Sequence, residues 1–142
     1  MFLLIGESIE NGVEREVFEE TGIRAHFRGI FALTYKQDFR FGHADVYFGC
    51  LMSLNEDEED QQIAFDPLEV AACKWMSLDE WANTPELHPY PITLHFARTA
   101  VAVLDGREQL LEPDLLKINS PNSNRPPWEI TIFRKKDTNE TQ

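Results

Sequence analysis

Apolar residues recur at every fourth position near the start of the chain, and acidic residues lie between them. Ile9, Val13 and Val17 share this spacing, which places all three on one side of a helix. Gly22 then provides a stop signal. The pattern therefore predicts a helix over residues 8–21.

Aromatic and β-branched residues dominate several later stretches. Such runs, bounded by turn residues, are typical of strands, and they predict strands over residues 24–36, 43–54, 69–76 and 128–133. Residues 113–127 are rich in Pro, Asn and Ser, so we expect a loop there.

Two further helices are indicated downstream. Ser77 and Glu80 have the spacing of a reciprocal N-terminal cap, which predicts that a short helix begins there. A longer helix follows Pro89 and ends near Gly106. Its apolar residues at helical spacing are Ile92, Phe96, Ala100 and Val103.

Length and composition indicate one globular domain. The chain has 142 residues, of which 42% are hydrophobic, and this is enough for a buried core. The formal net charge is -12 and the sequence shows no basic patch, which argues against nucleic acid as a partner. An acidic protein can still bind phosphates when a divalent cation lies between them.

The cysteine content favours a reducing compartment. Cys50 and Cys73 lack metal-site spacing and the density of a disulfide scaffold, so we expect reduced, buried thiols. An intracellular, most simply cytoplasmic, location follows, with the mitochondrion and nucleus as alternatives. The apolar residues 1–5 are too few for a signal peptide or a membrane span, and they predict a strand or the edge of the core.

The first helix carries a crowded set of glutamates. Glu16 and Glu20 are four residues apart and Glu19 is three from Glu16, so their β-carbons lie within about 5–6 Å. Arg15 can reach Glu19, which leaves Glu16 and Glu20 without a cation of their own. Mg²⁺ and Mn²⁺ prefer carboxylate oxygens and exchange their waters for phosphate oxygens. The cluster thus predicts a metal site for a diphosphate, with a solvated acidic face as the alternative.

Other polar and aromatic candidates carry less information. The acidic residues 55–60 suit a solvated loop better than a cation site, because the calcium-loop spacing is absent. No two histidines have metal-ligand spacing on one helix; they are His26, His43, His88 and His95. Some aromatic residues could stack on a nucleobase or fill the core instead, namely Phe39, Phe41, Tyr47 and Trp81.

Residues 7–23 resemble the signature of a known family. Glu7, seven further residues, and then Arg-Glu-Val-Phe-Glu-Glu-Thr-Gly-Ile match the Nudix box at every defined position except its first Gly, where the chain has Met1. Trp-Met-Ser-Leu at residues 75–78 and Pro-Ile-Thr at 91–93 are also similar to the family. The resemblance covers residues 6–105 and is strongest to the fibroblast-growth-factor-antisense branch, which is related to plant hydrolases of ADP-ribose and NADH.

The resemblance implies an α+β fold, a Nudix-type α/β/α sandwich with a mixed sheet, here without the N-terminal strands. It further implies that residues 1–134 form a single, partial Nudix domain and that residues 135–142 are a polar tail. The chain begins inside the Nudix box, which has three possible explanations. It is a fragment of a longer hydrolase, a degenerate member of the family, or a chain that is completed by forming a homodimer.

Roles for individual residues follow from the same resemblance. Glu16, Glu19 and Glu20 would bind Mg²⁺ or Mn²⁺, and Glu16 would also orient or deprotonate the attacking water. Arg15 would hold the glutamates by charged hydrogen bonds, and Glu7 would support the same cluster.

Glu69 would supply a further carboxylate from a later loop, with an ordinary strand-edge glutamate as the alternative. The implied reaction is the hydrolysis of nucleoside diphosphates linked to another moiety, with ADP-ribose or NADH-type dinucleotides as substrates and AMP as a product. No covalent nucleophile, nucleic acid or membrane is required. The other function class is a catalytically inactive, Nudix-like binding or interaction module.

Overall fold

The computed structural model describes residues 4–36, 45–55, 57, 60–87, 91–118 and 128–135. Within these ranges the chain forms three α-helices, four strands and a short 3₁₀ turn over Pro85–Leu87. In chain order, the helices and strands are α1 (Ile9–Thr21), β1 (His26–Lys36), β2 (Asp45–Ser53), α2 (Leu78–Asn83), α3 (Pro91–Leu104), β3 (Glu112–Ile118) and β4 (Trp128–Arg134).

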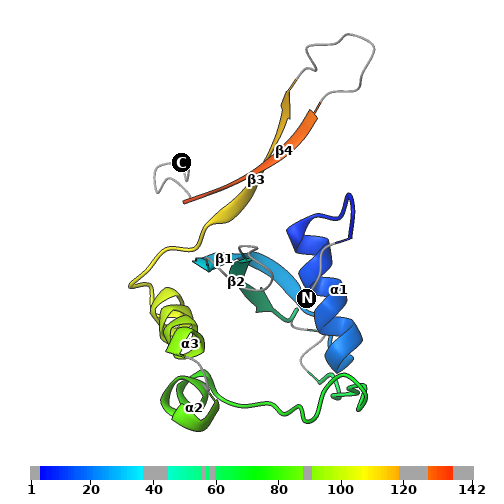
Figure 1. The fold of residues 1–142 in the computed structure, drawn as a ribbon, viewed down its shortest axis with the longest axis vertical. Coiled ribbons are helices and arrows are strands. Elements are labelled where there is room, and N and C mark those ends of the chain that lie inside the picture. The colour runs from blue at the N-terminus through cyan, green and yellow to red at the C-terminus, as the bar shows by residue number, and fades with distance from the viewer. Residues whose placement is uncertain are drawn as a thin grey trace.

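β1 and β2 form an antiparallel pair at the centre of the molecule (Figure 1). Leu33 lies opposite Phe48, and two irregularities interrupt the register near the start of β1. Beside them the ring of Phe31 covers Gly49, where an added β-carbon would lie 2.6 Å from the ring. A larger residue at position 49 would therefore require the Phe31 ring to move.

Helix α1 covers one side of this pair. Its residue Val13 is buried against Phe27 and Ile30 of β1, and this trio forms the centre of the core. The backbone N–H of Phe27 also donates to Glu14 Oε1 at 2.8 Å, which ties the strand to the helix. Partly buried side chains complete the packing: Ile9, Val17, Phe48, Cys50, Met52, Leu111 and Phe133.

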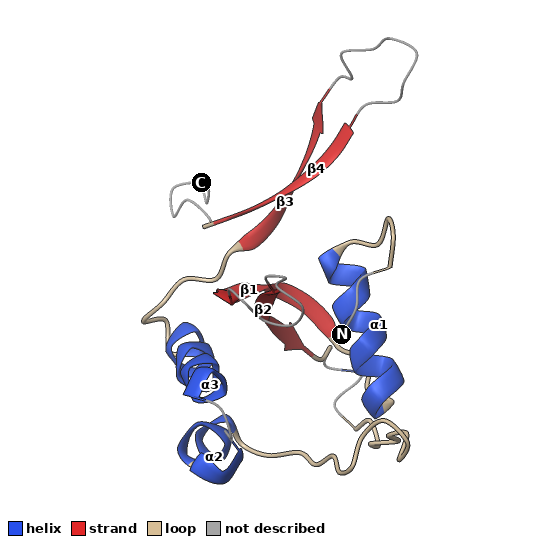
Figure 2. Ribbon diagram, viewed as in Figure 1, coloured by secondary structure: helices blue, strands red, loops and turns tan. Residues whose placement is uncertain are grey.

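Helices α2 and α3 lie on another side of the strand pair (Figures 1 and 2). Phe96 of α3 meets Phe31 of β1 edge-on, with the ring centroids 5.9 Å apart. Ser77 caps α2, its Oγ accepting from the Glu80 N–H at 3.1 Å, as predicted. The Glu80 carboxylate accepts from Lys74 Nζ at 3.0 Å.

Strands β3 and β4 form a second antiparallel hairpin that extends away from the rest of the molecule (Figure 1). The loop predicted from residue 113 is therefore wrong over its first part, and residues 119–127 lie outside the described residues. Pro113 has no backbone N–H to donate. It is tolerated in β3 because each strand of a two-stranded pair has an outer edge that forms no ladder hydrogen bonds.

The strand predicted over residues 69–76 is also wrong. Asp66 closes a turn in which its backbone carbonyl accepts from the N–H groups of Glu69 and Val70, at 3.1 and 2.8 Å. Those two amides are thus used locally, and residues 69–76 join no strand ladder in the described part of the chain. The strand or core edge expected at residues 1–5 begins outside the described residues, which start at residue 4. Leu4 O accepts from the Glu7 N–H, and Leu4 and Ile5 are exposed in a turn, so the expectation is wrong for these two residues.

The architecture is α+β, as expected, and the described strands pair antiparallel only, so the expected mixed sheet is not formed among them. Cys50 and Cys73 are both free thiols, and each is half-buried. Among the described residues, no helix combines the length and apolar character needed to cross a membrane.

Candidate active site

The site begins with the local signals that fix α1. Ser8 Oγ accepts from the Asn11 N–H at 3.1 Å and caps the first turn. Gly22 ends the helix with φ 73°, and its N–H donates to Phe18 O at 2.8 Å. Between these caps, Val13 points into the core. The acidic residues therefore occupy the remaining faces of the helix.

Arg15 is the centre of the polar arrangement on α1. Its Nε donates to Glu7 Oε1 at 2.9 Å and its Nη2 to Glu7 Oε2 at 3.1 Å, which makes the pair bidentate. Its Nη1 donates to Glu16 Oε1 at 3.0 Å and to Glu19 Oε2 at 2.8 Å. We call these four residues the Arg15 cluster.

The contacts of Arg15 correct the expectation that Glu16 has no cation, and they confirm that Arg15 hydrogen-bonds glutamates of α1. Glu16 was expected to have no cation of its own, but Arg15 contacts it, because the guanidinium can donate from several nitrogens at once. Of the expected hydrogen bonds from Arg15 to the glutamates, those to Glu16 and Glu19 are present. Glu7, only 12% exposed, also accepts the Leu4 N–H at 2.9 Å, so it joins the N-terminal turn to α1.

Charge pairing shifts the pKa values of Glu7 and Arg15. The hydrogen bond from Arg15 holds the pKa of Glu7 below its ordinary value, and the bond from the Leu4 N–H acts in the same direction. The Glu7 carboxylate in turn raises the pKa of Arg15. Both groups therefore stay charged at neutral pH.

The three glutamates proposed as metal ligands share α1. Glu16 is one-fifth exposed and Glu19 about half, and Glu20 is half-buried one turn after Glu16. Carboxylate oxygens on adjacent turns are the donors that hard divalent cations prefer, so the donor set fits Mg²⁺ or Mn²⁺. As the side chains lie, no three acidic, His or Cys residues in the described ranges converge on one point. A cation would have to compete with Arg15 for Glu16 and Glu19.

Glu69 is exposed in the turn that follows Pro67, rather than at a strand edge. It belongs to no group of three metal-ligating residues among those described, and its catalytic role stays a prediction. Of the acidic residues 55–60, positions 56, 58 and 59 lie outside the described residues.

The histidines and aromatic residues singled out from the sequence are dispersed. His26 Nε2 lies 2.9 Å from Asn55 Nδ2, and His95 is exposed on α3. Tyr47 is exposed on β2, and Trp81 is half-buried on α2. The remaining candidates fall outside the described residues: His43, His88, Phe39 and Phe41.

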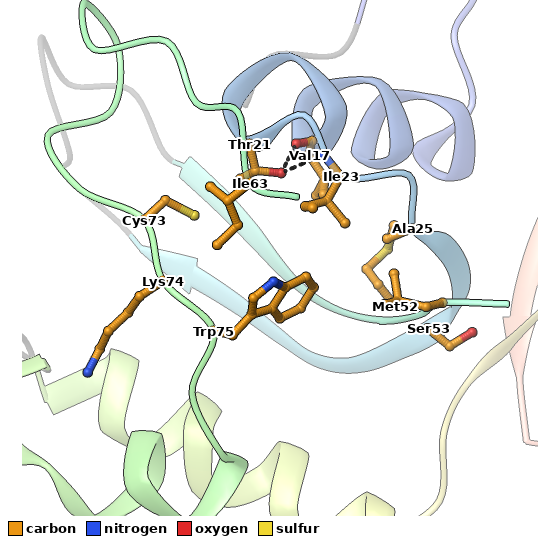
Figure 3. Close-up of a pocket in the computed structure, with 11 residues that line it drawn as sticks. Val17, Thr21, Ile23, Ala25, Met52, Ser53, Ile63, Cys73, Lys74 and Trp75 are labelled. Carbon is orange, nitrogen blue, oxygen red and sulfur yellow. Dashed lines mark hydrogen bonds between the residues drawn. The ribbon is translucent and has the colours of Figure 1, made fainter. Parts of the chain in front are cut away.

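Sequence reasoning missed a pocket of about 270 Å³ beside the C-terminal half of α1. Figure 3 shows the Trp75 indole turned toward Ile63 and Met52, with Val17 above them. We call it the Trp75 pocket; it is lined by Val17, Thr21, Ile23, Ala25, Met52, Ser53, Leu54, Ile63, Cys73, Lys74 and Trp75. No signal in the sequence pointed to this pocket, because the strand predicted over residues 69–76 assigned both Cys73 and Trp75 to a sheet.

The chain is similar in sequence to several known proteins. The chain is 29% identical over 117 residues to Nudix hydrolase 2 of Arabidopsis thaliana, covering 82% of this chain and 40% of that protein. It is 36% identical over 97 residues to mouse nucleoside diphosphate-linked moiety X motif 6, covering 66% of this chain and 28% of that protein. The chain thus spans less than half the length of these relatives. Residues 2–96 match the model of the NUDIX domain, and the chain belongs to the Nudix family.

Proposed function

We propose that this chain is a metal-dependent pyrophosphohydrolase of nucleoside diphosphates linked to another moiety. The observation that carries the proposal is the Arg15 cluster, in which one guanidinium bonds three carboxylates around α1. Membership of the Nudix family and the nucleoside diphosphate in the name of the mouse relative support this substrate class. Within it, we propose ADP-ribose or NADH-type dinucleotides as substrates and AMP as a product.

In this proposal Glu16, Glu19 and Glu20 hold Mg²⁺ or Mn²⁺. When bound, the cation neutralises phosphate charge and increases the acidity of a water molecule. Arg15 positions Glu16 and Glu19 through its Nη1, while its other two donors are fixed by Glu7. Glu16 orients or deprotonates the attacking water, and Glu69 supplies a further carboxylate from a later loop.

We further propose that the domain extends to residue 134. The matched region ends at residue 96, but Leu111 pairs with Ile30, and Phe133 packs on Phe27 with ring centroids 6.2 Å apart. These contacts connect the second hairpin to the same core.

Replacement of Glu16 by Gln tests the proposal. The E16Q chain should lose AMP release from ADP-ribose or NADH, assayed by chromatography with Mg²⁺ or Mn²⁺, by at least about a hundredfold in kcat. Glu10→Gln removes the same charge from an exposed position of α1 and serves as the matched control. Hydrolysis by E16Q at the rate of the E10Q control would refute the assignment.

A second candidate is a Nudix-like module that binds without turnover. One observation favours it: among the described residues, no three potential metal-ligating side chains converge on one point. Calorimetric titration with Mn²⁺, alone and with ADP-ribose, separates the two functions. Binding of both ligands without AMP release would support the module, and AMP release would support the hydrolase.

A further inference from the structure

We propose that the Trp75 pocket receives the nucleobase of the substrate, which rests on the proposed function and extends it to the recognition of the ligand. The indole of Trp75 is 57% exposed, although tryptophan is usually well buried. Its ring lines the pocket beside Ile63 and Met52 (Figure 3). An aromatic face held at the wall of an apolar pocket is suited to stack on a flat ring.

The volume of the Trp75 pocket suits one ring system of a ligand and not a whole dinucleotide. Sites that enclose a whole drug-sized molecule usually measure roughly 300–1,000 Å³. The Trp75 pocket, at about 270 Å³, lies just below this range. It therefore accommodates one ring system, with the rest of a dinucleotide left outside.

The position of the pocket places it near the proposed reaction site. Val17 and Thr21 line the pocket, and each directly follows a proposed metal ligand, Glu16 or Glu20, in α1. Side chains on neighbouring faces of one helix are separated by no more than the helix diameter, about 10–12 Å. A nucleoside diphosphate could thus reach from the pocket to the glutamates with only its ribose between them.

Three polar side chains of the lining, Thr21, Ser53 and Lys74, are already hydrogen-bonded within the protein. Thr21 Oγ1 donates to Val17 O at 2.6 Å, and Ser53 Oγ accepts from Arg28 Nε. Lys74 points away from the pocket in Figure 3, and its Nζ donates to Glu80. The pocket therefore binds by stacking and apolar contact, and we expect weak discrimination between adenine and guanine.

Two cysteines provide a test that does not require turnover. Cys73 lines the pocket, whereas Cys50 packs against the core on β2. The wild-type chain is alkylated with iodoacetamide in the presence and absence of adenosine, and each cysteine is followed by peptide mass spectrometry. Adenosine should slow the alkylation of Cys73 severalfold and leave Cys50 unchanged, and guanosine should protect within about threefold of adenosine.

The proposal would be overturned if saturating adenosine left the alkylation rate of Cys73 unchanged. It would also be overturned if adenosine slowed the alkylation of Cys73 and Cys50 equally. Because adenosine has no phosphate, protection does not depend on the metal site. Protection without any turnover would count against the hydrolase alone, and turnover abolished by E16Q without protection would count against the pocket alone.

Substitution of the indole supplies a second measurement. Trp75→Ala should raise KM for ADP-ribose about tenfold, by more than it lowers kcat, because stacking on a base is lost. Trp75→Phe keeps an aromatic face and should recover most of this loss. Trp81→Phe, on α2 and outside the pocket, is the matched control. Equal KM values for W75A and the control would contradict the stacking role.

Discussion

Arg15 bonds Glu7 on one side and Glu16 and Glu19 on the other, so one side chain joins the N-terminal turn to two carboxylates of the first helix. A guanidinium offers five donors in a fixed plane, so it can hold a bidentate carboxylate and still bond two more. Lysine, with a single charged nitrogen, could not reproduce this set of contacts. The family resemblance predicted which residues belong to the cluster. Helical spacing alone left Glu16 without a cation, whereas the resemblance implied the bond from Arg15 that the structure contains.

The lowered pKa of Glu7 predicts how stability depends on pH. A carboxyl whose pKa is depressed by folding adds stability above its unfolded value of about 4.3, and this is lost as the pH falls through the folded value. Glu7→Gln should therefore lower Tm at pH 7, and the difference from wild type should shrink below about pH 4.3. Thermal unfolding followed by circular dichroism at pH 7 and pH 3 measures this.

Glu10→Gln is the reference for this comparison, because it removes a charge from the exposed first turn of the same helix. A deficit of E7Q that stays constant from pH 7 to pH 3 would show that Arg15 does not hold the Glu7 carboxylate in solution.

At the level of the elements, caps explain why the helices begin and end where the sequence predicts. Ser8 and Ser77 each accept a backbone N–H three residues ahead, and Gly22 and Gly106 adopt positive φ at the helix ends. These interactions are local, so the chain encodes them within a few residues. The strand predicted at residues 69–76 failed because a strand depends on a partner and not only on its own residues.

The two helix-ending glycines allow a matched prediction. Both have φ near 72°, where a β-carbon costs about 1–2 kcal/mol. At Gly22 the added carbon would also lie 3.0 Å from Ala64 Cβ, whereas at Gly106 it would meet nothing within 4 Å. Gly22→Ala should therefore destabilise the chain more than Gly106→Ala.

Urea unfolding of the two variants measures the difference. The midpoint should fall further for G22A, and Ala64 is the specific reason, since its N–H also donates to Thr21 O at 2.8 Å. Equal midpoints would mean that Ala64 moves away without cost.

At the level of the whole molecule, the β3–β4 hairpin is joined to the core by few contacts. Leu111 and Ile30 exchange backbone hydrogen bonds of 2.9 Å in both directions, and Phe133 packs edge-on against Phe27. A two-stranded hairpin is at best marginally stable in water, so these contacts should decide whether it forms. The exposed Leu115 and Ile130 show how little of it is covered.

Removal of the aromatic contact should loosen the hairpin selectively. Phe133→Ala is expected to cost about 1–3 kcal/mol, less than a fully buried Phe, because the side chain is only partly buried. Hydrogen exchange should then speed up at the amides of β3 and β4 and change little in β1 and β2. Ile132→Ala, at the next position of β4 and more exposed, is the control. Uniform acceleration in both hairpins would instead show that the molecule unfolds as one unit.

The sequence by itself determined the features that depend on near neighbours: the first and third helices, the cap at Ser77, the strands at β1, β2 and β4, and the glutamates that share α1. Helical spacing and capping act over a few residues, so they can be read from the chain. Tertiary structure decided what depends on distant partners. It formed β3 against β4, left residues 69–76 without a strand partner among the described residues, and assembled the Trp75 pocket from four separate segments. The reason is that pairing and packing join residues that are distant in the sequence.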